Sequence, residues 1–543
     1  MKSIVTILAL ILTFSGFAQN SLPDYKVQKI IKENSTAFIG KTDQGLIAYK
    51  TSSEGKLALG YFNTSNDFTE INHASLGDYR VEKAFLRNGK VVLITSNRDA
   101  LTKMDKKKRG PNASLYFNTL TINLETKEVK KKIKAVKYLF VLGNRLTIEE
   151  SPNQKFTVIW YGFQIIKKTI ISHFTVLGAD FSKVYGKTYN EERVKYEYKN
   201  LSSILVSNIG DLAIMTKGNY SPKTHKIIPL RLDYYLDPEV DGDDYPGLYT
   251  LTGKKYGYMT NHIAIHCFGK EQKKVKFDID FERQYEFVVR KGCKMTLDQD
   301  GLIHVAGLFS DAYASIHAKG IFRLELNPKT GDRKDIYHEY FSENFVLKVL
   351  PTDKLKEKAR AVYAKEGYPE IAELEVRDFQ LKEDGTSLLV LEYIDYEISN
   401  AVVSMSKAFT GNLVFLELSK TNEISWFSSI EKKQLFAFPK NLYGVNKIYT
   451  AFDQESGYTV LFNEWKPTDK LKKKSKFGVD VDFPKLVGYT VSLDGTVSEK
   501  TMLYDSSADG VLVLPNKSIR MDANQFILKG DKEREITYFN LSK

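Results

Sequence analysis

The stretch from Cys293 to Tyr340 decides the fold, because it reads as one complete structural unit: CKMTLDQDGLIHVAGLFSDAYASIHAKGIFRLELNPKTGDRKDIYHEY. Three of its runs have the alternating or continuous apolar pattern of strands, and these are Cys293 to Leu297, Leu302 to Phe309 and Ile321 to Leu326. Asp300-Gly301 and Asn327–Gly331 are turn sequences, and a polar fourth run follows the second of them. The pattern predicts a four-stranded antiparallel meander, in which Arg323 and Glu325 take the polar positions of the third strand.

Units of the same kind recur along the chain. Each contains short alternating runs that are separated by Asp-Gly, Asn-Gly or similar turns. The least regular is Leu146 to Lys195, although Phe156 to Phe163 and Ile170 to Leu177 still predict strands inside it. The remaining predicted units are Thr36 to Leu76, Tyr79 to Lys134, Tyr198 to Phe281, Val376 to Lys433 and Lys447 to Tyr504.

The two ends of the chain complete the pattern. The C-terminal region offers three strands, which are Ser518 to Asp522, Gln525 to Lys529 and Glu535 to Leu541. The N-terminal region has one spare strand, Tyr25 to Ile31, before the first full unit. A sheet shared between the ends would leave no free edge, and free edges favour aggregation.

Radial repetition of four-stranded sheets is the architecture of a β-propeller. We therefore predict an all-β fold of eight blades closed by the shared blade, or of seven if Leu146 to Lys195 is not a blade. The chain resembles β-propeller repeat proteins in general, on its Asp-Gly and Asn-Gly turns, but it has neither the WD dipeptide nor the kelch double glycine. The resemblance implies an architecture and no particular ligand. An open array of β-sandwiches is the competing fold.

The first 18 residues predict a secretory signal peptide. Lys2 supplies the positive start, Ile4 to Phe14 the apolar core, and Gly16-Phe17-Ala18 the small residues of a cleavage site before Gln19. The apolar run is too short for a membrane anchor, and no later run is long enough to cross a bilayer. We expect residues 19–543 to form one exported propeller domain, periplasmic or extracellular, soluble and monomeric.

Composition limits the range of partners. The chain of 543 residues has a net charge of +12 and is 42% hydrophobic, which is typical of a globular protein. A basic protein favours acidic partners, here an anionic polysaccharide or an envelope protein, although lysines also serve solubility. Nucleic acid is not expected, because the protein is exported and lacks a recognition module. Cys267 and Cys293 lie on apolar faces of strands, so two buried thiols are expected rather than a disulfide.

Long connections are where binding residues concentrate on a rigid scaffold. The second-to-third connections are long, at Ser96 to Ala113, Asp311 to Lys319, Asp395 to Gly411 and Trp465 to Lys485. One crossover predicts the single good helix, Asp353 to Glu366, which Thr352 or Asp353 caps and Gly367 ends. Its apolar stripe is expected to dock onto the blades, and consists of Leu355, Ala359, Val362 and Tyr363.

Two of these connections are strongly basic. One carries Lys106, Lys107, Lys108 and Arg109, and the other carries Lys472, Lys473 and Lys474. On an eight-bladed propeller they belong to the second and seventh blades and lie on the same face. They are the candidate ligand-binding residues, for a polyanion, and the alternative is two solvated loops.

Metal sites are not favoured by the sequence. His262 and His266 have helical spacing but lie in a strand, where four residues span roughly 13 Å, too far for one zinc ion. His304 is expected to be buried with a partner. Asp241, Asp243 and Asp244 form a weak calcium candidate without the spacing of an EF-hand. No cofactor is expected.

No serine elbow, zinc-protease helix or phosphate-binding loop is present in the sequence. We therefore expect a non-catalytic propeller that binds a ligand or partner. The alternative is a propeller-type glycosidase or lyase, whose carboxylates would come from different blades. Trp160, Trp426 and Trp465 would stack on sugars in such an enzyme, but core packing is the simpler role.

Overall fold

The computed structural model describes most of the chain, and all structural statements below refer to that part. The described residues are 26–32, 36–63, 67–104, 113–140, 144–166, 169–192, 198–220, 260–270, 275–279, 287–310, 317–367, 369–372, 374–397, 407–421, 423–432, 434–437, 449–453, 457–464, 485–507, 510–521, 525–532 and 535–542. The predicted signal peptide lies outside them, so it stays a prediction.

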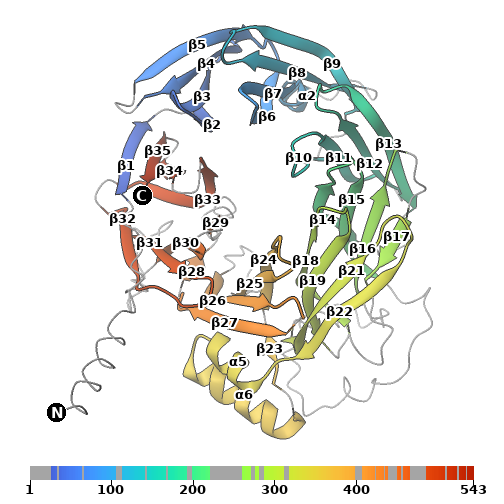
Figure 1. Ribbon diagram of the computed structural model, residues 1–543, viewed down its shortest axis with the longest axis vertical. Helices are drawn as coiled ribbons and strands as arrows, with labels where there is room; N and C mark the ends of the chain where they lie inside the picture. The colour runs from blue at the N-terminus through green and yellow to red at the C-terminus, as the bar shows by residue number, and fades with distance from the viewer. Residues whose placement is uncertain are drawn as a thin grey trace, which may run out of the picture. The chain divides into compact units, whose positions relative to one another are not determined.

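Eight antiparallel sheets with a four-stranded meander order are the blades of a β-propeller (Figure 1). The count of eight is confirmed, and the irregular unit that begins at Leu146 is a true blade. By their contacts the residues group into two compact units, one of Met1–Ser75, Tyr396–Gly411 and Trp426–Lys543, the other of Leu76–Asp395 and Asn412–Ser425.

The first unit holds three blades. Blade 1 consists of β2 (Thr36–Thr42), β3 (Gly45–Thr51), β4 (Lys56–Phe62) and β5 (Phe68–Ser75). Blade 7 consists of β29 (Tyr449–Asp453), β30 (Gly457–Glu464), β31 (Lys485–Val491) and β32 (Thr501–Asp505). The terminal blade consists of β1 (Lys26–Lys32), β33 (Leu512–Arg520), β34 (Gln525–Lys532) and β35 (Glu535–Ser542).

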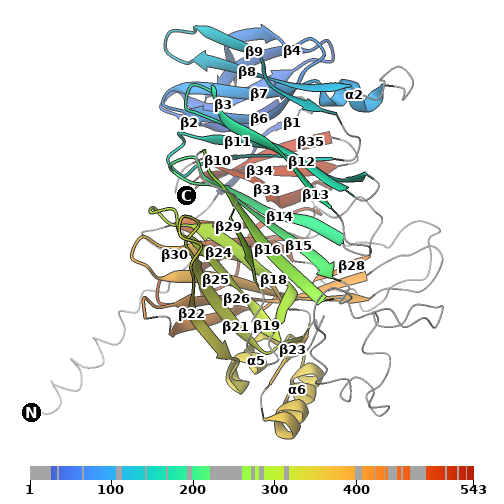
Figure 2. The ribbon, with the colours of Figure 1, turned by 90° about the vertical axis from the view of Figure 1, so that its right-hand side faces the viewer.

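The terminal blade confirms that the two ends of the chain share a sheet. β1 pairs antiparallel with β35, with Val27 opposite Leu541 and Gln28 opposite Asn540, and Figure 2 shows β1 beside β35 and β34. Val27 packs against a buried cluster that includes Phe539 and Leu541. Apolar burial and a strand ladder therefore hold the first strand of the protein to its last.

The second unit holds four complete blades, which are blades 2 to 5. Blade 2 consists of β6 (Arg80–Arg87), β7 (Lys90–Ser96), β8 (Ser114–Asn123) and β9 (Val129–Leu139). Blade 3 consists of β10 (Arg145–Glu150), β11 (Thr157–Ile166), β12 (Thr169–Leu177) and β13 (Lys183–Glu192). Blade 4 consists of β14 (Tyr198–Val206), β15 (Leu212–Tyr220), β16 (Thr260–Phe268) and β17 (Val275–Asp278).

Blade 5 contains the stretch from Cys293 to Tyr340, which forms the predicted meander. Its strands are β18 (Phe287–Leu297), β19 (Ile303–Ser310), β21 (Gly320–Leu326) and β22 (Arg333–Tyr340). Blade 6 consists of β24 (Leu374–Leu381), β25 (Ser387–Glu397), β26 (Lys407–Leu418) and β27 (Ile424–Ile430).

Successive blades in the second unit pack through apolar faces. One buried cluster joins blades 4 and 5 and contains Met215, Ile265, Cys293 and Val305. A comparable cluster joins blades 2 and 3 around Phe117. Because period-two alternation puts one side of each strand into such a cluster, the same pattern that predicts the strands also forms the core.

Several connections contain structure where loops were predicted. The connection after Ser96 holds the short helix α2 (Arg98–Lys103). The connection before Lys319 holds β20 (His317–Ala318), which pairs with β23 (Ile371–Ala372). Blade 6 has a fifth strand, β28 (Gln434–Ala437), paired with the first half of β26. These short elements lack the periodicity of the main strands.

The predicted helix from Asp353 to Glu366 is confirmed as α6 (Asp353–Glu366). The Thr352 side chain accepts a hydrogen bond from the Leu355 amide, and Gly367 ends the helix in the left-handed conformation, at φ 82°. It was predicted to be the single good helix, which was wrong, because α5 (Glu343–Val349) directly precedes it and contacts it (Figures 1 and 2).

The apolar stripe of α6 was predicted to dock onto the blades; the structure shows the stripe partly buried and α6 in contact with α5. Ala359 is buried and Leu355 and Val362 are half-buried, whereas Tyr363 is exposed.

Across the described residues, no helix combines the length and apolarity that a membrane span requires.

Candidate functional site

The predicted ligand-binding and calcium residues fall outside the described part of the chain. They are Lys106, Lys107, Lys108, Arg109, Lys472, Lys473, Lys474, Asp241, Asp243 and Asp244. Their roles therefore stay predictions, and the site described below rests on other residues.

The histidines and tryptophans that were considered as site residues lie in strands wherever the structure describes them. His262 and His266 lie in strand β16 as predicted, opposite Gly218 and Ile214. Trp160 is fully buried in the core, as its packing role predicts. Trp426 lies against Gly495, where an added Cβ would be 2.6 Å from the indole ring, and Trp465 is outside the described residues. Within those residues, no group of three or more His, Cys, Asp or Glu side chains is placed to hold a metal ion.

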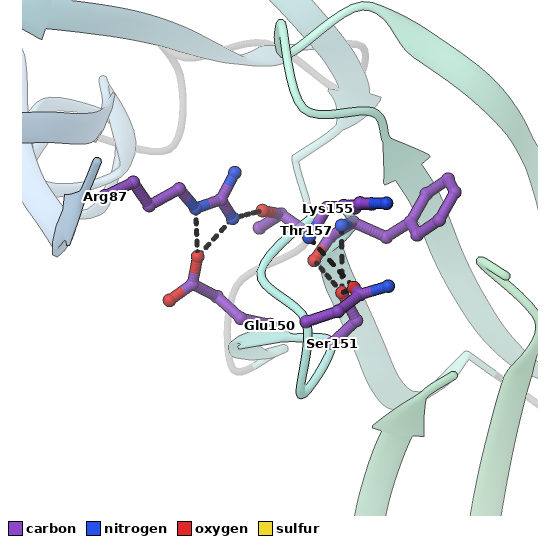
Figure 3. A network of polar contacts seen from close by, with 7 residues as sticks. Arg87, Glu150, Ser151, Lys155 and Thr157 are labelled. Carbon is purple, nitrogen blue, oxygen red and sulfur yellow. Dashed lines mark hydrogen bonds and ion pairs between the residues drawn. The ribbon is translucent and has the colours of Figure 1, made fainter. Parts of the chain in front are cut away.

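The best-defined polar site joins blades 2 and 3 at Arg87, the last residue of β6 (Figure 3). Arg87 Nε donates to Glu150 Oε1 at 2.5 Å, and Arg87 Nη2 donates to Thr157 Oγ1 at 2.6 Å. The guanidinium plane also lies 4.8 Å from the centroid of Phe181. A planar, permanently charged fork that meets a carboxylate, a hydroxyl and a ring at once fixes the relative position of two blades.

The turn after Glu150 holds these partners in place. Ser151 Oγ accepts from the Phe156 amide at 2.9 Å and donates to Asn153 Oδ1 at 2.7 Å. The turn itself is fixed to blade 4, because the Asn153 amide donates to Asn208 Oδ1 at 2.9 Å. Thr157, the first residue of β11, is therefore presented to Arg87 by a rigid turn.

Two carboxylates at this site have raised pKa values. Burial raises the pKa of Glu150, and the neighbouring Arg87 opposes that rise. Burial also raises the pKa of Glu149, and Lys83 on β6 opposes it. Adjacent strand residues point to opposite faces, so Glu149 and Glu150 lie on different sides of β10. Arg87 contacts Glu150, whereas the exposed Lys83 opposes the rise in the pKa of both carboxyls.

A third carboxylate with a raised pKa lies at the other end of β6. Burial is the largest cause for Glu82, and a hydrogen bond from Ser96 opposes it. Glu82 and Arg87 are five positions apart on β6. The two carboxylates have separate partners, since Glu82 accepts from Ser96 and Glu150 accepts from Arg87.

A second buried polar chain joins blades 5 and 6. Asp298 Oδ2 lies 2.9 Å from His304 Nε2, His304 Nδ1 lies 3.5 Å from Arg323 Nη2, and Arg323 Nη1 donates to Ser387 Oγ at 3.2 Å. His304 is thus buried with partners, as predicted. Arg323 occupies a polar position of the third strand, as predicted, but its side chain is buried, because that face of β21 meets the next blade rather than water.

The order of this chain excludes a serine nucleophile at Ser387. A catalytic serine needs a histidine that accepts its proton, whereas here the cationic Arg323 lies between the histidine and the hydroxyl. Ser387 and His304 are also buried, at 0% and 5% exposure. Asp298, His304, Arg323 and Ser387 therefore form a structural link.

The two links share a design that was not predicted from the sequence. In each, an arginine donates to the hydroxyl of the first residue of the second strand in the following blade, Thr157 of β11 or Ser387 of β25. The sequence does contain a signal for the hydroxyl partners, because Thr157 and Ser387 both follow a hairpin turn. The arginines could not be recognised, since Arg87 lies in a first strand and Arg323 in a third.

Further charged pairs lie inside blade 6. Arg377 contacts Glu392, and it lies 3.1 Å from Glu375. Lys382 contacts Glu417. Because Glu392, Glu375 and Glu417 are all buried, these pairs hold neighbouring strands together rather than face a ligand.

Both cysteines are free and buried, which confirms the two predicted thiols. Cys293 Sγ lies 3.8 Å from Met215 Sδ in the cluster between blades 4 and 5. Burial raises the pKa of Cys267 to about 12, so its reactive thiolate is suppressed.

Comparison with known proteins assigns the chain to no family. No family model matches the chain, and no curated protein matches it. Among solved structures, the WD40 domain of SCAP from fission yeast is 7% identical, with a TM-score of 0.35 over 95% of this chain and 98% of that one.

Two glycoside hydrolases are also similar in structure. An α-L-arabinanase of Penicillium chrysogenum is 9% identical, with a TM-score of 0.24 over 75% of this chain and 99% of that one. A thermostable family-43 glycoside hydrolase is 12% identical, with a TM-score of 0.22 over 58% of this chain and 97% of that one. Likenesses this distant carry no argument about activity.

Proposed function

We propose that this protein is an exported, non-catalytic β-propeller that binds a ligand or partner in the cell envelope or outside the cell. The observation that carries the proposal is that the two described polar links use their arginine side chains to join neighbouring blades. Arg87 with Glu150 and Thr157, and Arg323 with Ser387, join blades of the second unit. Such a rigid scaffold leaves recognition to the connections between strands.

The basic connections are the proposed contact with an anionic polysaccharide or an acidic envelope protein. Lys106, Lys107, Lys108 and Arg109 follow α2, and Lys472, Lys473 and Lys474 lie between β30 and β31. Charges in contact with solvent are screened over about 8 Å at physiological ionic strength, so we expect the binding to weaken as salt rises.

The test replaces Lys106, Lys107, Lys108, Lys472, Lys473 and Lys474 by glutamine and measures retention on an immobilised anionic polysaccharide across a salt series. We expect earlier elution of the variant and unchanged thermal unfolding, since surface substitutions change stability by about 0.5 kcal/mol or less. Coincident elution of the variant and the wild type would reject these residues as the site.

Export is tested separately. The apolar run Ile4 to Phe14 and the small residues up to Ala18 support cleavage before Gln19. Mass spectrometry of the protein recovered from the periplasm or medium should show a chain that begins at Gln19. An intact N-terminus in the cytosolic fraction would contradict export.

One observation favours the alternative function, a propeller-type carbohydrate-active enzyme. Glu149 is half-buried beside Lys83, and its pKa is raised, as in carboxyl groups that donate a proton. Release of reducing ends from polysaccharides by the wild type, and its loss in Glu149→Gln, would establish this function. No release by either protein would leave the binding function.

A further inference from the structure

The outer strand of blade 2 combines lysines with exposed aliphatic side chains. β9 reads VKKKIKAVKYL, and every side chain from Val129 to Lys134 is exposed. Ile133 is 64% exposed, and Val129 and Leu139 are each 40% exposed. Exposed aliphatic side chains thus alternate with lysines along this strand, a combination found on surfaces that bind a partner or a membrane.

The pairing register places most of these residues on one face. On β8, Phe117 points into the core cluster shared with blade 3, so Tyr116, Leu120 and Ile122 point the other way. Their partners on β9 are Lys137, Lys131 and Val129 respectively. That face of β9 therefore carries Val129, Lys131 and Lys137, with Leu139 two residues beyond Lys137.

A β-bulge interrupts the strand between these residues. The register shifts between Phe117 and Thr119, and Lys134 has a φ of 51°, in the left-handed region that residues with side chains rarely adopt. Asn118 Oδ1 accepts from the Lys134 amide at 2.7 Å, which holds the bulge in place. Ile133 lies in this irregular part of β9 and is 64% exposed. The irregular edge disfavours addition of a further strand.

The lysines of this face remain available to a partner. Lys134 Nζ and Lys137 Nζ lie 4.9 Å and 5.7 Å from the ring centroid of Tyr116. Such contacts orient the amines without neutralising them. Lys132 is different, because it points to the other face, where its amine donates to the Phe181 carbonyl at 3.2 Å.

We propose that this face of β9, formed by Val129, Lys131, Ile133, Lys134, Lys137 and Leu139, binds the surface of an anionic lipid bilayer. Lysines gain from anionic headgroups, and aliphatic side chains gain from the headgroup–acyl boundary. A polysaccharide would use the lysines but leave Ile133, Val129 and Leu139 in water. The proposal goes beyond the function proposed above and uses a different surface.

The test is co-sedimentation of the mature protein with vesicles of phosphatidylcholine, with and without 30% phosphatidylglycerol. The first variant is Lys131→Gln with Lys134→Gln and Lys137→Gln, and the second is Ile133→Ser. Each lysine near an anionic surface is worth about fivefold in partitioning, so the triple variant should bind roughly 100-fold more weakly. Ile133→Ser should lose about tenfold, even in high salt.

The matched control removes the same charge from exposed positions on α6, as Lys354→Gln with Lys358→Gln and Lys365→Gln, and should bind like the wild type. All variants should unfold at the wild-type temperature, because the substituted side chains are exposed. Equal binding to neutral and anionic vesicles, or wild-type binding by the triple β9 variant, would overturn the proposal. A third outcome would replace the membrane site by a polyanion site. In that outcome the triple lysine variant loses vesicle binding, Ile133→Ser does not, and the wild type binds a soluble polyanion as tightly as it binds anionic vesicles.

Discussion

Arg87 is the residue on which the junction between blades 2 and 3 depends. Its side chain is 8% exposed and its partner Glu150 is 22% exposed, so neither charge can be fully solvated if the pair is broken. We expect Arg87→Ala to lower the free energy of unfolding by about 2–4 kcal/mol, measured by chemical denaturation. Arg80→Ala is the control on the same strand, since Arg80 donates to the carbonyls of Gly77 and Tyr79. Equal losses in the two variants would contradict the special role of Arg87.

Glu149 makes a prediction about pH. Burial raises the pKa of its carboxyl above the ordinary value of 4.5, so the folded protein favours the protonated form. That contribution to stability is complete below pH 4.5 and is lost as the pH rises through the raised pKa. Glu149→Gln should therefore melt at a higher temperature than the wild type at pH 7, and the advantage should vanish near pH 4. A pH-independent difference would show that packing, and not ionisation, is responsible.

The helix α6 makes a prediction at the scale of one element. Thr352→Ala removes the side-chain bond to the Leu355 amide and should cost the helix about 1 kcal/mol, whereas Thr352→Ser should keep it. Because much of the helix surface is exposed, we expect faster hydrogen exchange in α6 and unchanged exchange in blade 5. Faster exchange spread through blade 5 would mean that α6 also stabilises that blade.

The elements also show how far the sequence predicts the structure. The strands of blade 5 and the bounds of α6 could be predicted, because alternation, Asp-Gly turns and the pair Thr352 and Gly367 are local signals. β20 could not, since a two-residue strand has no period and pairs with residues more than 50 positions away. Burial of Arg323 was missed for a similar reason: its partner Ser387 is 64 residues away, and period two does not say which face meets another blade.

For the whole molecule, the sequence predicts eight blades because each blade repeats the same pattern of strands and turns. The shared blade is predicted because the C-terminal region offers only three strands, whereas the N-terminal region has one strand before its first full unit. The links at Arg87 and Arg323 form only when neighbouring blades pack together, and no linear sequence motif predicts them. The basic connections carry the proposed function, and the exposed face of β9 carries a separate surface.

The terminal blade is the most direct test of the architecture, because β1 and β35 are joined only when the chain ends meet. Val27 and Ile30 pack against the buried clusters of the first unit, and β1 covers the edge of β35. Thermal unfolding should be compared between a chain that starts at Gln19 and one that starts after Lys32. We predict that the truncated chain loses about 2–4 kcal/mol of stability, from two partly buried aliphatic side chains and a strand ladder. An unchanged cooperative transition in the truncated chain would contradict the shared blade.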